Sequence, residues 1–173
     1  MRYVIKQKVL ALAEKFNIRD EEGNKVYQVK GKLISLGDKL SLSDMSGNEI
    51  AKIKQELISI TPSYRIYRNE TLQADVEKKL IKFFKDNFKV KMKDGSEDIK
   101  ISGSILEHEY TFRRNRKVIG RVTKAWVSIG DRYGIEINQN EDDVLLLACV
   151  IIVDMIVHAA KKKNEKGKGK KKK

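Results

Sequence analysis

The sequence has few of the residues on which catalytic and metal sites are usually built. It contains one cysteine, Cys149, and two histidines, His108 and His158. A single cysteine cannot form an intrachain disulfide, which fits a reducing compartment. None of the patterns GxSxG, GxxxxGK[ST], GxGxxG or HExxH occurs in the chain. We therefore expect no metal, no cofactor and no enzymatic activity.

Long apolar runs are also absent, with one exception near the C-terminus. The first residues, MRYVIKQK, lack the apolar core of a secretory signal, so the expected location is the cytoplasm. The exception is DDVLLLACVIIVDMIVHAA, residues 142–160, which would be apolar on every side of a helix and must be enclosed by lipid or by protein. As a helix it would reach only about 28 Å, near the lower limit for a bilayer core. Its uninterrupted apolar part is shorter still, so we predict a buried core helix over residues 142–160.

Residues 1–140 show short alternating runs divided by turn residues, which is typical of antiparallel strands. Two turns are near copies of each other, one from Asp20 to Gly23 and one from Asp44 to Gly47. In each, the aspartate can accept backbone N–H bonds and the glycine can adopt the left-handed conformation of a tight hairpin. Further turns are expected at Gly37-Asp38, Thr61-Pro62, Asp94-Gly95, Arg114-Asn115-Arg116 and Gly130-Asp131.

A sheet with one apolar face must curl around a core or pack on a second layer. The apolar helix is the only object in the chain that could fill such a sheet. The sequence therefore predicts a mainly β fold, a closed antiparallel barrel with the C-terminal helix inside. The predicted structural core of that helix includes Val144, Leu147, Val150 and Ile151, with Cys149 as a small buried hydrophobe and not a nucleophile.

Asp154 is the one charged residue within the core of the helix. An unpaired buried carboxylate is costly, so Asp154 should lie near the barrel mouth or be paired. His158, four residues on, shares its helix face. We interpret Asp154 as a polar anchor that holds the helix against barrel groups, in preference to a catalytic acid.

The positive charge is concentrated at the C-terminus. The net charge is +13, and residues 161–173 contribute +8 of it through nine lysines and one glutamate. This Lys/Gly segment has no apolar residue, so we predict a disordered tail that follows a folded domain of residues 1–160. Its first lysines, Lys161, Lys162 and Lys163, are candidates for binding anionic lipid or nucleic acid. A solubilising tail without a specific partner is the alternative.

A second basic group surrounds the predicted turn at Asn115 and consists of Arg113, Arg114, Arg116 and Lys117. It is the other candidate site for an anionic ligand, and with the tail it could bind nucleic acid non-specifically. The alternating lysines of residues 88–93 are interpreted differently, as the solvated face of a strand.

Two segments resemble the LURP-one-related family. One runs from Tyr3 to Tyr67 and begins YVIKQKVLALAEKFNIRDEEGNKVYQVKGKL; the other is GRVTKAWVSIGDRYGIEI, from Gly120 to Ile137, followed by EDD and the apolar helix. The resemblance covers nearly everything except the lysine tail. It implies the tubby-like fold shared with tubby C-terminal domains and phospholipid scramblases, a barrel of about twelve strands around a central helix.

The same resemblance implies membrane-related functions. Tubby domains bind phosphoinositides, and scramblases are associated with membranes and calcium. A calcium segment proposed for scramblase-like proteins corresponds here to residues 131–142. Tyr133 and Ile135 occupy its third and fifth positions, where an EF-hand-like loop needs oxygen ligands, so we expect no calcium site. The acidic residues 141–143 are predicted to cap the helix.

We therefore expect a non-enzymatic binding or scaffold domain. Its basic surface and lysine tail would associate with anionic phospholipid head groups, peripherally and without spanning the membrane. A non-specific nucleic-acid-binding protein is the alternative, and a scramblase-like lipid transporter is a third possibility.

Overall fold

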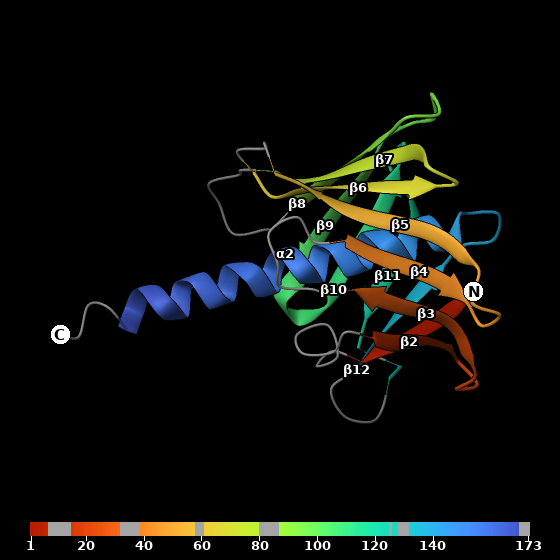
Figure 1. Cartoon of the computed structure of the whole chain (residues 1–173), viewed down its shortest axis with the longest axis horizontal. Helices are drawn as coiled ribbons and strands as arrows, with labels where there is room; N and C mark the ends of the chain where they lie inside the picture. Colours follow the sequence, from red (N-terminus) through yellow and green to blue (C-terminus); the bar gives the residue numbers. More distant parts are fainter. Residues whose placement is uncertain are drawn as a thin grey trace.

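The residues described in this computed structural model form a closed barrel of twelve antiparallel strands with a long helix through its interior (Figure 1). They are residues 1–6, 15–31, 39–57, 61–79, 87–124, 126–127 and 132–169, without the side chains of residues 87 and 161–169. The elements are, in chain order, β1 (Arg2–Lys6), β2 (Lys15–Asp20), β3 (Lys25–Gly31), β4 (Lys39–Asp44), β5 (Glu49–Glu56), β6 (Ser63–Arg68), β7 (Thr71–Lys78), β8 (Asn87–Met92), β9 (Ile99–Ser104), the 3-10 turn η1 (Ile105–Glu107), β10 (Glu109–Arg114), β11 (Lys117–Thr123), β12 (Arg132–Ile137) and α2 (Asp143–Gly169).

The wall of the barrel has the simplest possible topology. Each strand pairs with the next strand along the chain, and β1 closes the barrel by pairing with β12. In this closing register Arg2 lies opposite Glu136 and Ile5 opposite Tyr133. The predicted fold, a closed antiparallel barrel around a C-terminal helix, is confirmed.

The duplicated turns form two hairpins, as predicted. Gly23 donates its N–H to the carbonyl of Asp20 and has a φ of +91°, and Gly47 does the same toward Asp44 with a φ of +92°. The carboxylate of Asp44 also accepts the N–H of Asn48 at 2.9 Å. This local chemistry explains why the two turns could be predicted from a few residues.

The other expected turns have mixed outcomes. Those at Thr61-Pro62 and Asp94-Gly95 lie between consecutive strands, and the one at Arg114–Arg116 begins at the last residue of β10 and ends just before β11. Those at residues 37–38 and 130–131 lie outside the described residues. The sequence reading missed the tight turn between β6 and β7, where Asn69 and Glu70 have positive φ values of 46° and 58°.

The two ends of the barrel differ. At the helix-start end, α2 begins and β12 ends. The turns at this end connect β2 to β3, β4 to β5, β6 to β7, β8 to β9 and β10 to β11. At the opposite, helix-exit end, β1 ends, β2 and β12 begin, and α2 leaves the barrel and projects away from it (Figure 1). Since neighbouring strands alternate in direction, every strand runs from one of these ends to the other.

The helix fills the barrel with the predicted residues. Leu147, Val150 and Ile151 are fully buried, whereas Val144 at the start of the helix is partly buried against the same core. The stretch Asp143–Ala160 is long and apolar enough to cross a membrane, with a mean hydropathy of 2.3, but 72% of it is buried inside the barrel. In this structure the strands of the chain itself enclose the helix.

The boundaries of the helix differ from the expected 142–160. Asp142 precedes the helix as its cap, because its carboxylate accepts the N–H of Leu145 at 2.9 Å, which agrees with the predicted acidic cap. At the other end α2 continues to Gly169, so residues 161–169 are helical and not the expected disordered tail. Lysine and glutamate are good helix formers, and they extend a helix that the barrel has already nucleated. Residues 170–173 lie outside the described chain.

Candidate anion-binding surface

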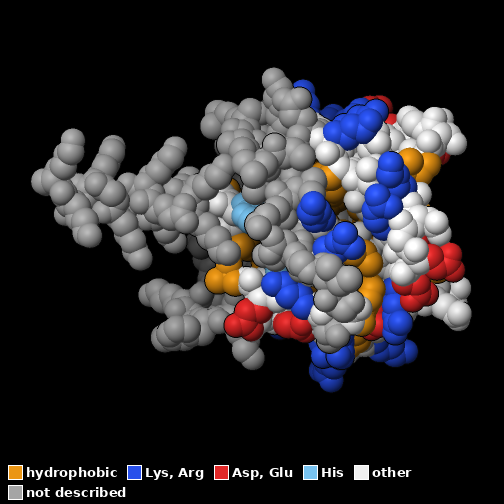
Figure 2. Space-filling view, turned by 90° about the horizontal axis from the view of Figure 1, so that it is seen from below, with side chains coloured by type: hydrophobic (Ala, Val, Ile, Leu, Met, Phe, Trp, Pro, Cys, Tyr) orange, Lys and Arg blue, Asp and Glu red, His pale blue; other side chains and the backbone are white. Residues whose placement is uncertain are grey.

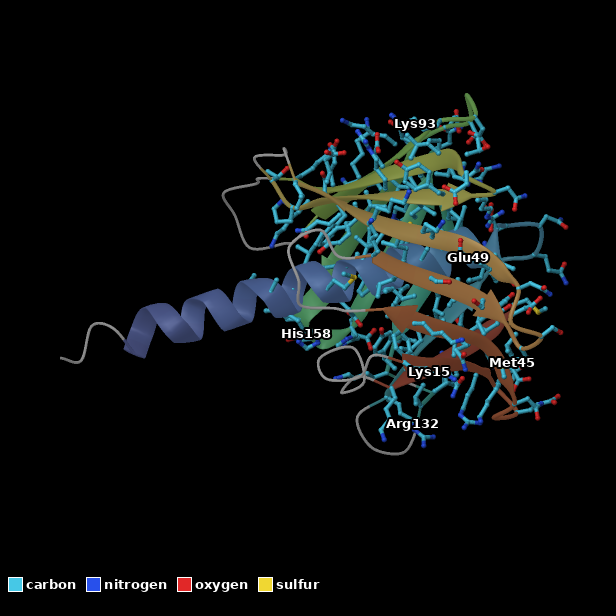
Figure 3. All side chains as sticks on the ribbon, in the orientation of Figure 1. Lys15, Met45, Glu49, Lys93, Arg132 and His158 are labelled. Carbon is cyan, nitrogen blue, oxygen red and sulfur yellow. The ribbon has the colours of Figure 1, made fainter. Side chains whose placement is uncertain are left out.

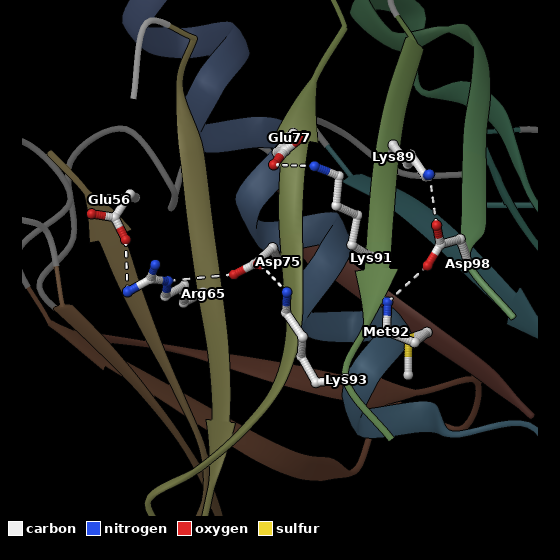
Figure 4. Close-up of polar contacts among 9 residues, drawn as sticks. All are labelled: Glu56, Arg65, Asp75, Glu77, Lys89, Lys91, Met92, Lys93 and Asp98. Atoms are coloured by element: carbon white, nitrogen blue, oxygen red, sulfur yellow. Dashed lines mark hydrogen bonds and ion pairs between the residues drawn. The ribbon is translucent and has the colours of Figure 1, made fainter. Parts of the chain in front are cut away.

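The outer face of β6 to β9 is rich in lysine, but the charges there are balanced. Three lysines of β8 and its continuation each contact a carboxylate of a neighbouring segment (Figure 4). The pairs are Lys89 with Asp98 (2.6 Å), Lys91 with Glu77 (2.9 Å) and Lys93 with Asp75 (2.7 Å). These lysines thus lie on a solvated strand face, as predicted, and leave little net positive charge for a ligand.

The predicted basic cluster lies at the helix-start end, around the β10–β11 turn. Arg114 forms an ion pair with Glu141 at 2.7 Å. Arg113 donates a hydrogen bond to the carbonyl of Arg116 at 3.2 Å, while Lys117 is exposed at the start of β11. One member of the cluster is therefore neutralised by a carboxylate beside the start of the helix.

The structure does not bring this cluster together with the predicted lysines of the tail. Lys161, Lys162 and Lys163 continue α2 beyond the helix-exit end. From Asp143 to Lys161 the helix rises by about 27 Å, so the two predicted basic groups lie at opposite ends of the barrel.

A different basic site is formed on the outer side of β12, β1 and β2. A hollow of about 300 Å³ is here called the seam pocket. Its lining residues in the described part of the chain include four basic and no acidic ones; they are Val4, Lys6, Lys15, Phe16, Asn17, Arg19 and Arg132. Lys15 and Arg132 lie on the lower side of the barrel in Figure 3. Figure 2 views the molecule from that side, where Lys and Arg side chains extend across the surface and Asp and Glu side chains gather in separate groups.

The seam pocket arises from a gap in the strand pairing. β1 pairs with β2 only at Tyr3–Asp20 and Val4–Arg19, whereas it pairs with β12 along its whole length, to Lys6. Beyond Val4 the two strands no longer pair, and the hollow lies where this ladder ends. The outward positions of the three strands supply the basic side chains that surround it.

The charges of the seam pocket are not neutralised within the described chain. Among the residues that the structure describes, Lys6, Lys15, Arg19 and Arg132 form no ion pair, in contrast to the lysines of β8. Arg19 donates one hydrogen bond to the carbonyl of Gly23, and a guanidinium has further N–H donors. The hollow lies where the pairing of β1 with β2 ends, and its cations form no ion pair in the described chain. Such a hollow favours an anionic ligand.

Sequence reasoning missed this site because its residues come from both ends of the chain. The available signal was their alternation, since Lys6, Lys15 and Arg19 each occupy an outward position of a strand. That signal shows exposure, but only the β1–β12 closure shows that these residues share one hollow with Arg132.

Trp126 lies beside this surface. Its indole packs on Gly134 of β12 so closely that an added Cβ there would be 2.1 Å from the ring. The guanidinium of Arg2 lies 5.5 Å from the ring centroid, within range of a cation–π contact. Gly134 pairs with Val4, a lining residue of the seam pocket. The only tryptophan of the chain is thus a neighbour of the basic hollow.

Inside the barrel, Asp154 contacts wall groups near the helix-exit end. The hydroxyl of Tyr133 donates a hydrogen bond to its carboxylate, and Nε2 of His108 lies 3.4 Å from the other oxygen. The rings of His108 and Tyr133 stack at 4.2 Å. Burial, and then the negative charge of Asp154, raise the pKa of Tyr133, which keeps its hydroxyl a donor. All three residues are at most 5% exposed, which supports the predicted polar anchor.

The architecture of the barrel shows the class of fold to which this chain belongs. A twelve-stranded antiparallel barrel around its own apolar helix is a tubby-like fold, and an X-ray structure of a protein from Arabidopsis thaliana has the same architecture. The two chains match with a TM-score of 0.65 and 20% sequence identity, over 88% of this chain and 90% of the other.

The family follows from the sequence comparisons. The chain belongs to the LURP-one-related family, whose model matches residues 1–154. It is also 30% identical over 154 residues to the uncharacterized protein YxjI of Bacillus subtilis (strain 168). This alignment covers 89% of this chain and 92% of that protein. The resemblance seen in the sequence is confirmed.

Proposed function

We propose that this chain is a binding domain that associates peripherally with anionic phospholipid surfaces through its helix-exit end. One observation carries the proposal: three basic residues of the seam pocket that form no ion pair in the described chain, Lys6, Lys15 and Arg132, lie at the same end of the barrel at which α2 leaves toward its lysines. The proposal assigns no reaction to the chain.

The pocket and the lysine segment lie at the same end because β12 and α2 are in contact there. Arg132 begins β12 and directly precedes Tyr133, whose hydroxyl contacts Asp154 of α2. Lys161 follows Asp154 by seven residues, which is about 10 Å of helix. The pocket and the lysine segment can therefore face one charged surface at the same time, and each lysine near an anionic membrane adds about 1 kcal/mol of attraction.

The helix-start end is a poorer candidate for such a surface because carboxylates pair with several of its cations, Arg114 among them. Arg68 forms an ion pair with Asp142, and Arg2 with Glu136 at 2.7 Å. Exposed apolar side chains do not distinguish the ends in the described chain, since Leu57 and Leu106 lie at the helix-exit end and Met1 and Met45 at the other. Charge makes the distinction.

The sequence of the strand connections favours lipid over nucleic acid. The connections that join β1 to β2, β3 to β4 and β7 to β8 lie outside the described residues, and they read QKVLALAE, KLISLGD and LIKFFKD. The turns of the helix-start end, such as DEEGN and DMSGN, are polar. Apolar and basic residues in combination are typical of proteins that bind a membrane interface.

Vesicle sedimentation would test the proposal. The full chain should bind vesicles of phosphatidylserine and phosphatidylcholine and not vesicles of phosphatidylcholine alone. A chain without residues 161–173 should bind more weakly at low salt and remain folded. Its residual binding should prefer the anionic vesicles to a single-stranded oligonucleotide, and the opposite preference would support the nucleic-acid alternative and contradict the proposal.

Salt gives a second control. Screening limits the reach of a charge to about 8 Å at physiological ionic strength, so the contribution of the tail should shrink as salt rises. Binding that is insensitive to salt and to the deletion, and equal on neutral vesicles, would exclude an electrostatic mechanism.

A further inference from the structure

We propose that the seam pocket is a specific site for a compact group with two phosphates, either a diphosphate or an organic bis-phosphate. This inference rests on the proposed function and names the chemistry that the same end of the barrel would select. Three properties of the hollow lead to it: the amount of charge, the position of its basic residues on paired strands and its mixed lining.

The amount of charge favours two phosphates. Four cationic side chains and, among the described residues, no carboxylate line the hollow. A phosphomonoester carries about −1.5 to −2 at neutral pH, so two such groups balance four cations. A phosphodiester with a single negative charge would leave most of the positive charge uncompensated.

The basic residues are held on strands. Lys6, Lys15, Arg19 and Arg132 belong to β1, β2 and β12, whose other edges are paired within the barrel. Sites on strands hold their side chains more precisely than sites on loops. Arg19 and Arg132 supply planar guanidinium groups that can bind phosphate through two N–H donors, and the two lysines supply mobile point charges.

The remaining lining residues suit an organic ligand. Asn17 contributes an amide, which accepts a hydrogen bond from Gln28 at 3.2 Å and retains its own N–H donors. Val4 provides apolar contact, and the volume of about 300 Å³ is at the lower end of small-molecule sites. A small carbon skeleton with two phosphates would fill such a hollow.

Calorimetry and fluorescence with soluble probes would test this inference on the full chain. Pyrophosphate and an inositol bisphosphate should each bind at one site, more tightly than inorganic sulfate. The fluorescence of Trp126 should change on binding because its indole lies beside the pocket on Gly134. Binding without saturation at one equivalent would overturn the inference.

Matched variants separate a site from diffuse attraction. The double variant Lys6→Gln/Arg132→Gln should weaken the affinity for the bis-phosphate at least tenfold. The control Lys100→Gln/Arg121→Gln removes the same charge from exposed positions of β9 and β11 and should change the affinity less than twofold. The comparison requires that both variants melt at the same temperature as the unmodified chain. Equal losses of affinity in the two variants would overturn the inference.

Vesicles then identify the source of the phosphates. If vesicles with a bis-phosphorylated inositol lipid bind more tightly than phosphatidylserine vesicles of equal surface charge, and the soluble bis-phosphate competes, the ligand is a lipid head group. If only the soluble compound binds, the site takes a free metabolite. If the full chain binds all anionic vesicles equally and neither variant matters, the inference fails while the proposed membrane association remains.

Discussion

The hydroxyl of Tyr133 on β12 donates a hydrogen bond to the carboxylate of Asp154 on α2, so the last strand of the wall and the helix inside it share a buried polar contact. We predict that Tyr133→Phe lowers the free energy of unfolding by about 1 to 3 kcal/mol, because the carboxylate then loses a buried donor. Urea denaturation followed by circular dichroism would measure the change.

Tyr110 provides the matched control for this prediction. Its hydroxyl is also buried in the barrel, but it has no hydrogen-bond partner among the described residues. Tyr110→Phe should therefore leave the stability unchanged or raise it slightly. Equal destabilisation by both substitutions would show that the Tyr133 contact has no special role.

A charge in the middle of the helix should prevent folding. Ile151 is fully buried, and a lysine at this position would have to give up the hydration of its charge inside the barrel. We predict that Ile151→Lys yields insoluble or unfolded protein, whereas Ile151→Val costs about 0.5 to 1.5 kcal/mol. A soluble lysine variant with an unchanged melting temperature would contradict the enclosed-helix structure.

Cys149 should be chemically silent in the folded protein. Its side chain is fully buried, and burial raises the pKa of the thiol, so little thiolate forms at neutral pH. We predict that a thiol reagent labels it slowly under native conditions and rapidly in urea. Fast labelling of the native protein would show that the helix leaves the barrel more readily than the packing implies.

Acid should destabilise the protein through its turn and strand carboxylates. Hydrogen bonds from Asn48 lower the pKa of Asp44, and the ion-paired Lys89 lowers the pKa of Asp98. A carboxyl with a depressed pKa in the folded state adds stability above its unfolded pKa, and this stability is lost as the pH falls through the folded value. We predict a melting temperature that falls below about pH 4. The decrease should be smaller in Asp44→Asn than in the wild type.

The parts of the fold that could be predicted from the sequence depend on short-range chemistry. The Asp20 and Asp44 hairpins require only a few neighbouring residues, and the enclosed helix follows from one continuous apolar segment. The pairing of Asp154 with Tyr133 could not be predicted in this way. The sequence predicts an anchor against barrel groups without saying which ones, because Tyr133 comes from a strand whose register depends on the whole barrel.

The candidate site depends even more on contacts between residues that are far apart in the sequence. Arg113 to Lys117 stand out because they are contiguous, yet Glu141 neutralises Arg114. Lys6 and Arg132 are far apart in the sequence and become opposite partners only when β1 meets β12. Short-range patterns identify charges, but the closing register decides which charges remain unpaired around one hollow.

The pairing of the first strand with the last also has a consequence for synthesis. Arg2 and Glu136 are 134 positions apart, and the helix that fills the barrel follows β12. A ribosome adds roughly 5 to 20 residues per second, so β1 waits for several seconds without its partner while the inward faces of the finished hairpins are exposed. A nascent chain of this protein therefore has a long period in which its wall exists without its core.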